Sequence, residues 1–205
     1  MRASESTPLV EWGTAGRPLD GERLSGDAQL VRILPGGALA AVVDGLGHGP
    51  QAAEASRLAV ATLEAGASDD VVALIRDCHE RLRRSRGVAL VVAWFGRGNQ
   101  MSYSGVGGLE AMLLRADPRT SLRRESLLLP GGVVGYQLPG LRRSVLEVRA
   151  GDVLVLATDG VRPGFAEGLQ LHEPPRDMAE GILGRHATGT DDALVLVVRY
   201  LGNGS

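Results

Sequence analysis

Lysine is absent from this sequence: all 22 basic residues are arginine. A Walker-type phosphate loop needs a lysine to reach the phosphates of its nucleotide, so an ordinary P-loop nucleotide hydrolase is excluded. Catalysis through a Schiff base is excluded too, because it requires a lysine amine. A compositional bias of the genome explains why arginine is used in place of lysine, so the absence of lysine does not by itself indicate a function.

Cysteines and long apolar runs are also scarce. The single cysteine, Cys78, rules out a disulfide framework and favours a reducing compartment. No apolar run approaches the length of a transmembrane helix, and the N-terminal residues lack the apolar core of a signal peptide. The net charge of −2 favours neither nucleic acid nor a membrane surface. We therefore expect a cytoplasmic protein that binds neither.

The chain of 205 residues can bury one substantial core. No linker or internal repeat divides it, so we predict a single domain over residues 1–205. Short segments rich in Val and Leu, bounded by Gly, Pro or Asp, predict eight strands, several of them apolar on both faces. These strands are 27–34, 38–45, 87–96, 100–107, 109–116, 142–149, 153–160 and 193–200.

Three helices are expected between these strands. The first begins near Pro50 and ends at Gly66, and the second begins at residues 68–70 and ends in the arginines of 81–86. The third covers residues 174–186. The order of elements predicts an α+β fold with mainly antiparallel strands in two sheets and the helices outside.

Acidic residues stand at the ends of four predicted strands. Asp44 and Asp159 each close an apolar run and precede a glycine, whereas Asp27 and Asp191 each open a run. In an antiparallel sheet the end of one strand lies beside the start of its neighbour, so the four carboxylates are expected on one rim.

The sequence LPGG at residues 34–37 predicts the register of one strand pair. A two-residue turn at Pro35–Gly36 would pair Leu34 with Gly37 and place Asp27 opposite Asp44. Two carboxylates that face each other repel, and a cation between them removes the repulsion.

A single Asp-Gly pair is more often a turn than a site. Here two such pairs follow apolar strands, a Gly-Asp precedes a third and an Asp-Asp precedes a fourth, and this combination favours a cation site. Oxygen ligands without cysteine or clustered histidine suit Mg²⁺ or Mn²⁺. His48, in the glycine-rich stretch beside Asp44, has two interpretations: it contacts substrate or a bound water, or it caps the following helix.

Six segments occur in an order typical of one enzyme family: SGD (25–27), VVDGLGHG (42–49), YSGVGGLEAMLL (103–114), GGVVGYQLPGLRRSVLEVRAGDVLVLATDG (131–160), which contains VLATDG (155–160), and GTDDALVLVV (189–198). Together they resemble the metal-dependent PPM serine/threonine phosphatases, in the SpoIIE/RsbX-like branch. The resemblance extends from about residue 10 to residue 200.

The resemblance implies an αββα sandwich with two Mn²⁺ or Mg²⁺ ions at one end. Asp44 would bridge both ions, the Gly45 carbonyl would bind one, and Asp159 and Asp191 would bind the other. Asp27 would be a ligand or would hold a metal-bound water. The reaction implied is hydrolysis of phosphoserine or phosphothreonine by a water that the two ions activate, without a side-chain nucleophile.

The sequence departs from eukaryotic members, which commonly read Asp-Gly-His-Gly-Gly. Leu46 follows Asp44-Gly45 here, and the nearby histidine is His48. His48 and Asp44 are accordingly the candidate catalytic residues, with water as the alternative general acid.

The resemblance also implies phosphorylated STAS-domain proteins of the stressosome as partners, negative feedback on the general stress response as the role, and a monomer. Alternatives are a phosphatase of a small STAS anti-anti-sigma factor and a catalytically weak binding module, against which the intact acids argue. Another two-metal hydrolase, such as a nuclease, should have stacking aromatics, and this chain has two Phe, two Trp and three Tyr.

Two segments have both a structural and a functional interpretation. Residues 116–140 are rich in turn formers and carry Arg119, Arg123 and Arg124, so they are expected at the surface as a loop or edge strand. They are either a connection between sheets or, together with the arginines of 81–86, a surface that docks a phosphorylated STAS domain.

Overall fold

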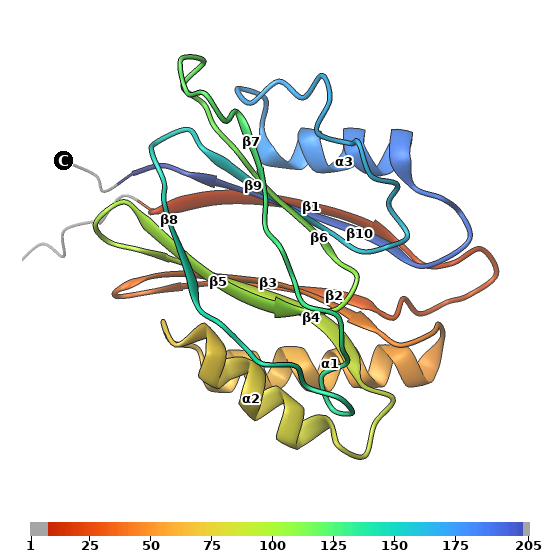
Figure 1. Cartoon of the computed structure of the whole chain (residues 1–205). Coiled ribbons are helices and arrows are strands. Elements are labelled where there is room, and N and C mark those ends of the chain that lie inside the picture. Colours follow the sequence, from red (N-terminus) through yellow and green to blue (C-terminus); the bar gives the residue numbers. More distant parts are fainter. Residues whose placement is uncertain (1–7, 203–205) are drawn as a thin grey trace, which may run out of the picture.

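The structure is a computed structural model that describes residues 8–202. Two antiparallel sheets pack face to face, with α1 and α2 outside one sheet and α3 outside the other (Figure 1). The first sheet has the strand order β1 (Val10–Arg17), β10 (Ala193–Tyr200), β9 (Val153–Ala157), β6 (Glu110–Leu114) and β7 (Arg124–Ser126). The second has the order β2 (Asp27–Leu34), β3 (Gly37–Gly45), β4 (Val88–Gly96), β5 (Gln100–Val106) and β8 (Ser144–Glu147). The helices are α1 (Pro50–Ala65), α2 (Val71–Leu82) and α3 (Pro175–His186). The predicted αββα sandwich is confirmed.

The strands that read as continuous apolar runs are covered on both faces. In β3, Ala40 and Val42 belong to the core between the sheets, whereas Leu39 and Val43 pack against the helices. Alternate side chains of a strand point to opposite faces, so a strand buried on both sides needs apolar residues throughout.

The hairpin of β2 and β3 has the predicted register. Leu34 pairs with Gly37, and Asp27 pairs with Asp44. The turn therefore places two carboxylates side by side at the far end of the hairpin.

Several elements differ from the sequence prediction. β1 was not predicted, because glycines at 13 and 16 interrupt its apolar pattern; Gly13 is needed, since a Cβ there would overlap the backbone of α3 at Arg176. The second helix has its N-cap within the predicted residues, at Asp70, which accepts a hydrogen bond from the Ala73 N–H (2.9 Å), but it ends earlier than predicted, at Leu82. The cluster that we expected to end the helix therefore lies mostly beyond it.

Residues 116–140 are only partly a surface connection. They contain β7 at the edge of the first sheet, and Leu127 and Val134 are buried. Leu128 and Tyr136 are strongly exposed. The expected edge strand is present, and the segment also contributes side chains to the core.

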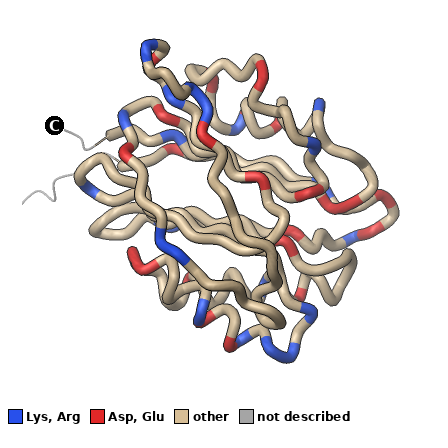
Figure 2. Tube along the Cα trace, viewed as in Figure 1, with Lys and Arg blue, Asp and Glu red and all other residues tan. Residues whose placement is uncertain are grey.

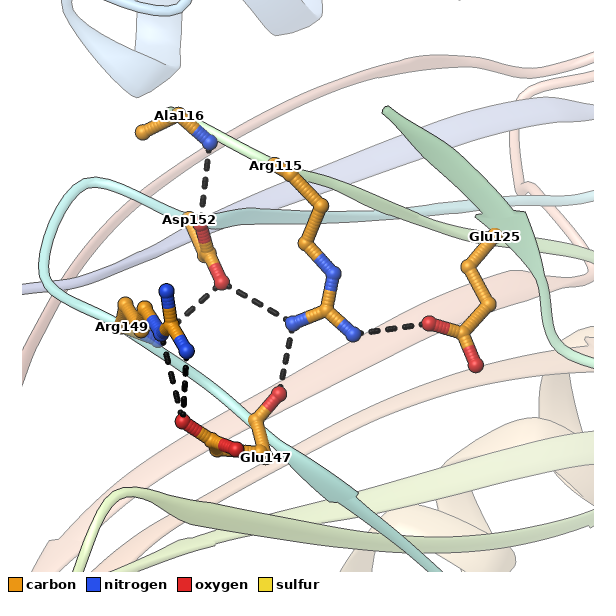
Figure 3. Close-up of polar contacts among 6 residues, drawn as sticks. All are labelled: Arg115, Ala116, Glu125, Glu147, Arg149 and Asp152. Carbon is orange, nitrogen blue, oxygen red and sulfur yellow. Dashed lines mark hydrogen bonds and ion pairs between the residues drawn. The ribbon is translucent and has the colours of Figure 1, made fainter. Parts of the chain in front are cut away.

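A polar network joins the two sheets near this segment (Figure 3). Arg115 donates hydrogen bonds to the carboxylates of Asp152 (3.1 Å) and Glu125 (2.8 Å) and to the carbonyl of Glu147. Asp152 is only 3% exposed, and Glu147 belongs to β8 of the other sheet. The network thus satisfies a buried charge and fixes β8 against the first sheet.

No helix within residues 8–202 is long and apolar enough to cross a membrane.

Candidate metal centre

The four carboxylates at strand ends come together at one end of the sandwich. Asp27 and Asp44 are paired across β2 and β3. Asp159 follows β9 and Asp191 precedes β10, and these two strands are neighbours in the other sheet. Acidic positions gather at this end of the two layers, where α1 begins (Figure 2). We call this set of four aspartates the acidic rim.

A hydrogen bond between the sheets fixes one carboxylate of the acidic rim. The Thr158 hydroxyl donates to Asp27 Oδ2 at 2.7 Å, and it accepts a hydrogen bond from the Leu194 N–H at 2.9 Å. Thr158 is fully buried. The sequence analysis missed this residue, although a hydroxyl between an apolar strand and Asp159 was a usable signal.

Asp192 holds the loop before β2 against the acidic rim. Its carboxylate accepts hydrogen bonds from the N–H groups of Leu19 (2.8 Å) and Gly26 (2.7 Å), and the residue is 3% exposed. The Ser56 hydroxyl of α1 donates to the carbonyl of Gly26. Both carboxylate oxygens of Asp192 are used in this way, so its position is structural.

The glycine of each Asp-Gly pair permits a close approach of backbone. A Cβ at Gly45 would overlap the backbone of Ala52 in α1, and a Cβ at Gly160 would overlap the carbonyl of Asp192. The Gly45 N–H donates to the Gly26 carbonyl at 3.0 Å. These contacts bring the loop, the helix and β10 next to the two aspartates, which a plain surface turn would not require.

Burial raises the pKa of Asp44 to about 8, and repulsion from Asp27, Asp159 and Asp191 adds to the effect. Burial also raises the pKa of Asp27 to about 7, although the hydrogen bond from Thr158 opposes this. The pKa of Asp159 is raised as well, by burial and then by Asp191. Ionised carboxylates in such a place are unfavourable unless a positive charge joins them.

The described residues supply no such positive charge. Within residues 8–202, no arginine or histidine forms an ion pair with any aspartate of the acidic rim. By contrast, the buried carboxylate of Asp152 is paired with Arg115. The donor set is all oxygen, which fits Mg²⁺ or Mn²⁺.

The carboxylates do not form a closed cage. In the described part of the chain, no three His, Cys, Asp or Glu side chains converge as a ready-made ligand set. Mg²⁺ usually keeps several water ligands and is held by one or two carboxylates, so an open rim of this kind fits such an ion.

His48 lies on the glycine-rich loop between Asp44 and α1. Its Nδ1 is 2.9 Å from Glu22 Oε1, and its side chain is largely exposed. It does not cap α1, whose N-cap is Gly49 without a side-chain hydrogen bond. The capping interpretation is therefore wrong, and a role toward substrate stays a prediction. The glycines on either side, Gly47 and Gly49, have positive φ angles, which allow this tight loop.

Cys78 has no features of a nucleophile. It is buried in α2 near the Ala59 carbonyl, and burial raises the pKa of its thiol to about 12. It is therefore protonated at neutral pH and packs as a small apolar residue.

Comparisons with known proteins agree with this fold. Residues 35–201 match the family described as stage II sporulation protein E (SpoIIE). A search of curated proteins found no significant match.

One similar solved structure comes from work on the bacterial stressosome as a modular system adapted to control secondary messenger signalling. It is 28% identical to this chain, with a TM-score of 0.83 over 93% of this chain and 99% of that chain. RsbX in complex with magnesium is 20% identical, with a TM-score of 0.82 over 97% of this chain and 98% of that chain. The PP2C phosphatase domain of SpoIIE from Bacillus subtilis, with a fragment of its regulatory domain, is 21% identical, with a TM-score of 0.77 over 96% of this chain and 64% of that chain.

Proposed function

The chain belongs to the SpoIIE family of PPM-type phosphatases, and on this premise we propose that it is a metal-dependent phosphatase that removes phosphate from serine or threonine side chains of STAS-domain stressosome proteins. The observation that carries the proposal is the acidic rim: four aspartates from both sheets, of which Asp27 and Asp44 are partly buried with raised pKa values, without a basic partner in the described residues. Such a rim is suited to hold cations that in turn bind a phosphate dianion.

The rim residues are proposed to take the roles that the family resemblance implies. Asp44 would contact both ions, the Gly45 carbonyl would contact one, and Asp159 and Asp191 would hold the other. Asp27, fixed by Thr158, would be a ligand or would orient a water. When bound, two Mn²⁺ or Mg²⁺ ions would neutralise the phosphate and lower the pKa of the attacking water.

His48 is proposed to handle the proton of the leaving oxygen. Glu22 contacts Nδ1, so Nε2 remains available toward solvent and substrate. A carboxylate hydrogen-bonded at Nδ1 fixes the orientation of the ring, as a proton donor requires. Asp192 would act only on position, by holding the loop that carries Glu22 and Gly26.

The stressosome as the target is supported by the similarity to RsbX and to the stressosome-related structure. The proposed role is negative feedback on the general stress response, in the cytoplasm and as a monomer. The second candidate is a phosphatase of a small STAS anti-anti-sigma factor, because the SpoIIE family match does not distinguish the two STAS substrates.

The test is phosphate release from two purified phosphoproteins, a stressosome STAS protein and a small STAS anti-anti-sigma factor, with Mn²⁺ present. We expect faster release from the stressosome protein, loss of activity in EDTA, and a rate lowered by orders of magnitude in Asp44→Asn. Full activity after metal removal would contradict the metal mechanism. A preference for the small factor would favour the second candidate, and folded protein inactive on both substrates would favour a binding module.

A docking surface for the substrate is proposed at Arg123 and Arg124, which are exposed at the start of the edge strand β7. Reversal of both charges should raise KM for the phosphoprotein and leave hydrolysis of a small aryl phosphate unchanged. Equal effects on the two substrates would remove this segment from the recognition surface.

A further inference from the structure

A cavity of about 600 Å³ opens at the end of the second sheet that is remote from the acidic rim. Its walls are the turn between β2 and β3, the turn between β4 and β5, and the loop between α1 and α2. The eight residues of β2 separate the cavity from Asp27, a span of about 23 Å for an extended strand. The cavity is therefore separate from the proposed catalytic site, and its volume is typical of small-molecule sites.

The floor of the cavity contains a buried hydroxyl without a partner. Ser102 pairs with Trp94 on one side and Val145 on the other, and all three side chains line the cavity. Ser102 is 3% exposed, and its Oγ forms no hydrogen bond to any residue of 8–202. It is the one buried side-chain oxygen or nitrogen in the described residues that lacks a partner. Such a group is costly unless something bonds to it.

Two arginines line the same cavity as this hydroxyl. Arg97 and Arg143 are exposed and line the cavity, and neither forms an ion pair within residues 8–202. Arg97 donates one hydrogen bond of 3.3 Å, to the Pro35 carbonyl. Asp69 is the single acidic residue of the lining, so positive charge is in excess. Free guanidinium groups are well shaped to bind a carboxylate or a phosphate.

Trp94 and Val145 give the cavity an apolar part. The indole of Trp94 is 8% exposed and lies against the glycines of the β2–β3 turn. A Cβ at Gly37 would overlap the Phe95 carbonyl and approach Trp94 Cζ2 to 2.6 Å, so glycine is required beside the ring. Val145 continues this surface and is half exposed. An apolar floor with a few polar groups at its margin is typical of ligand sites.

We propose that this cavity binds a small organic anion, one that carries a phosphate or carboxylate group on a flat apolar body. The anionic group pairs with Arg97 and Arg143, the body covers Trp94 and Val145, and the Ser102 hydroxyl donates to an acceptor of the ligand.

The first test uses Trp94 as a reporter. The chain has two tryptophans, and Trp12→Phe leaves Trp94 as the only one. AMP and phenylacetate are titrated as the phosphate and carboxylate probes, with adenosine and inorganic phosphate as controls that lack the charge or the flat body. We expect a saturable change in Trp94 fluorescence with at least one probe, weaker or no change with the controls, and the same affinity with and without Mn²⁺.

The second test removes the polar groups one at a time in the Trp12→Phe background. Ser102→Ala and Arg143→Ala should each weaken binding by about tenfold or more, as expected for a lost hydrogen bond to a charged or polar partner. Matched controls are Ser104→Ala, on the same strand and equally buried, and Arg142→Ala, next in sequence; neither residue lines the cavity. Without ligand, Ser102→Ala should be as stable as its parent or more stable, because no protein hydrogen bond is lost.

Two outcomes would overturn the proposal. One is the absence of any fluorescence change with both probes up to about 10 mM, where a site with a Kd of about 1 mM is nearly full. The other is binding that depends on Mn²⁺ or is weakened equally by the control variants, because the probe would then bind elsewhere.

Discussion

Asp44→Asn tests whether the carboxylates of the acidic rim destabilise the folded protein when no cation is bound. In the metal-free protein, Asp44 has a pKa of about 8 instead of 3.8, mainly because of burial. The folded protein therefore binds a proton more tightly than the unfolded chain. Its stability is greatest at low pH, falls as the pH rises above 3.8, and carries the full penalty above about 8.

The size of the penalty follows from the same values. At about 1.36 kcal/mol for each pH unit, the difference gives an upper limit of about 6 kcal/mol. The repulsion between Asp44 and Asp27 belongs to both residues, and water at the open rim lowers the cost of the charge further. We therefore expect the Asp44 carboxylate to destabilise the folded protein by about 2–3 kcal/mol at pH 8. For a chain of this length, that gain raises Tm by roughly 4–12 °C in Asp44→Asn at pH 8.

The assay is thermal unfolding of both proteins in EDTA at pH 5 and pH 8, and again with Mn²⁺. In EDTA at pH 8, Asp44→Asn should have a higher Tm than the wild type, and the difference in Tm should be smaller at pH 5. Mn²⁺ should raise the Tm of the wild type more than that of the variant. Asp77→Asn, an exposed aspartate of α2, is the control and should change little. A variant that is no more stable than wild type at pH 8 would refute the reasoning.

Further substitutions separate ligands from supporting residues. Asp191→Asn should abolish Mn²⁺-dependent activity with little loss of Tm. Asp192→Asn should retain more activity but lower the free energy of unfolding by about 1–3 kcal/mol, because its buried hydrogen bonds are disturbed. The reverse ranking of the two activities would show that the ligand assignment is off by one residue. Thr158→Val should keep the fold measured by circular dichroism and lower kcat, because Asp27 loses its hydrogen bond; unchanged kinetics would mean that Thr158 is dispensable. Asp152→Ala should lower the free energy of unfolding by about 3–5 kcal/mol in urea melts, because Arg115 loses a buried partner; an effect below about 1 kcal/mol would show that the network in Figure 3 contributes little.

Local patterns predicted much of the fold. Apolar runs identified most strands, and the LPGG turn predicted the pairing of Asp27 with Asp44. These features depend on neighbours in sequence: side chains alternate along a strand, and a two-residue turn fixes the register of a hairpin. β1 was missed because its glycines serve a contact with α3, about 160 residues away, which no local pattern contains.

The sequence by itself determined which residue types are available at the site: aspartates at strand ends, glycines beside them and no lysine. The tertiary structure decided what each of them contacts. Thr158 reaches Asp27 across the two sheets, and Asp192, next to the rim, bonds to the loop before β2. It also left Ser102 without a partner beneath a cavity. Burial and hydrogen bonding depend on residues that lie far apart in the chain, and only packing of the two sheets brings those residues together.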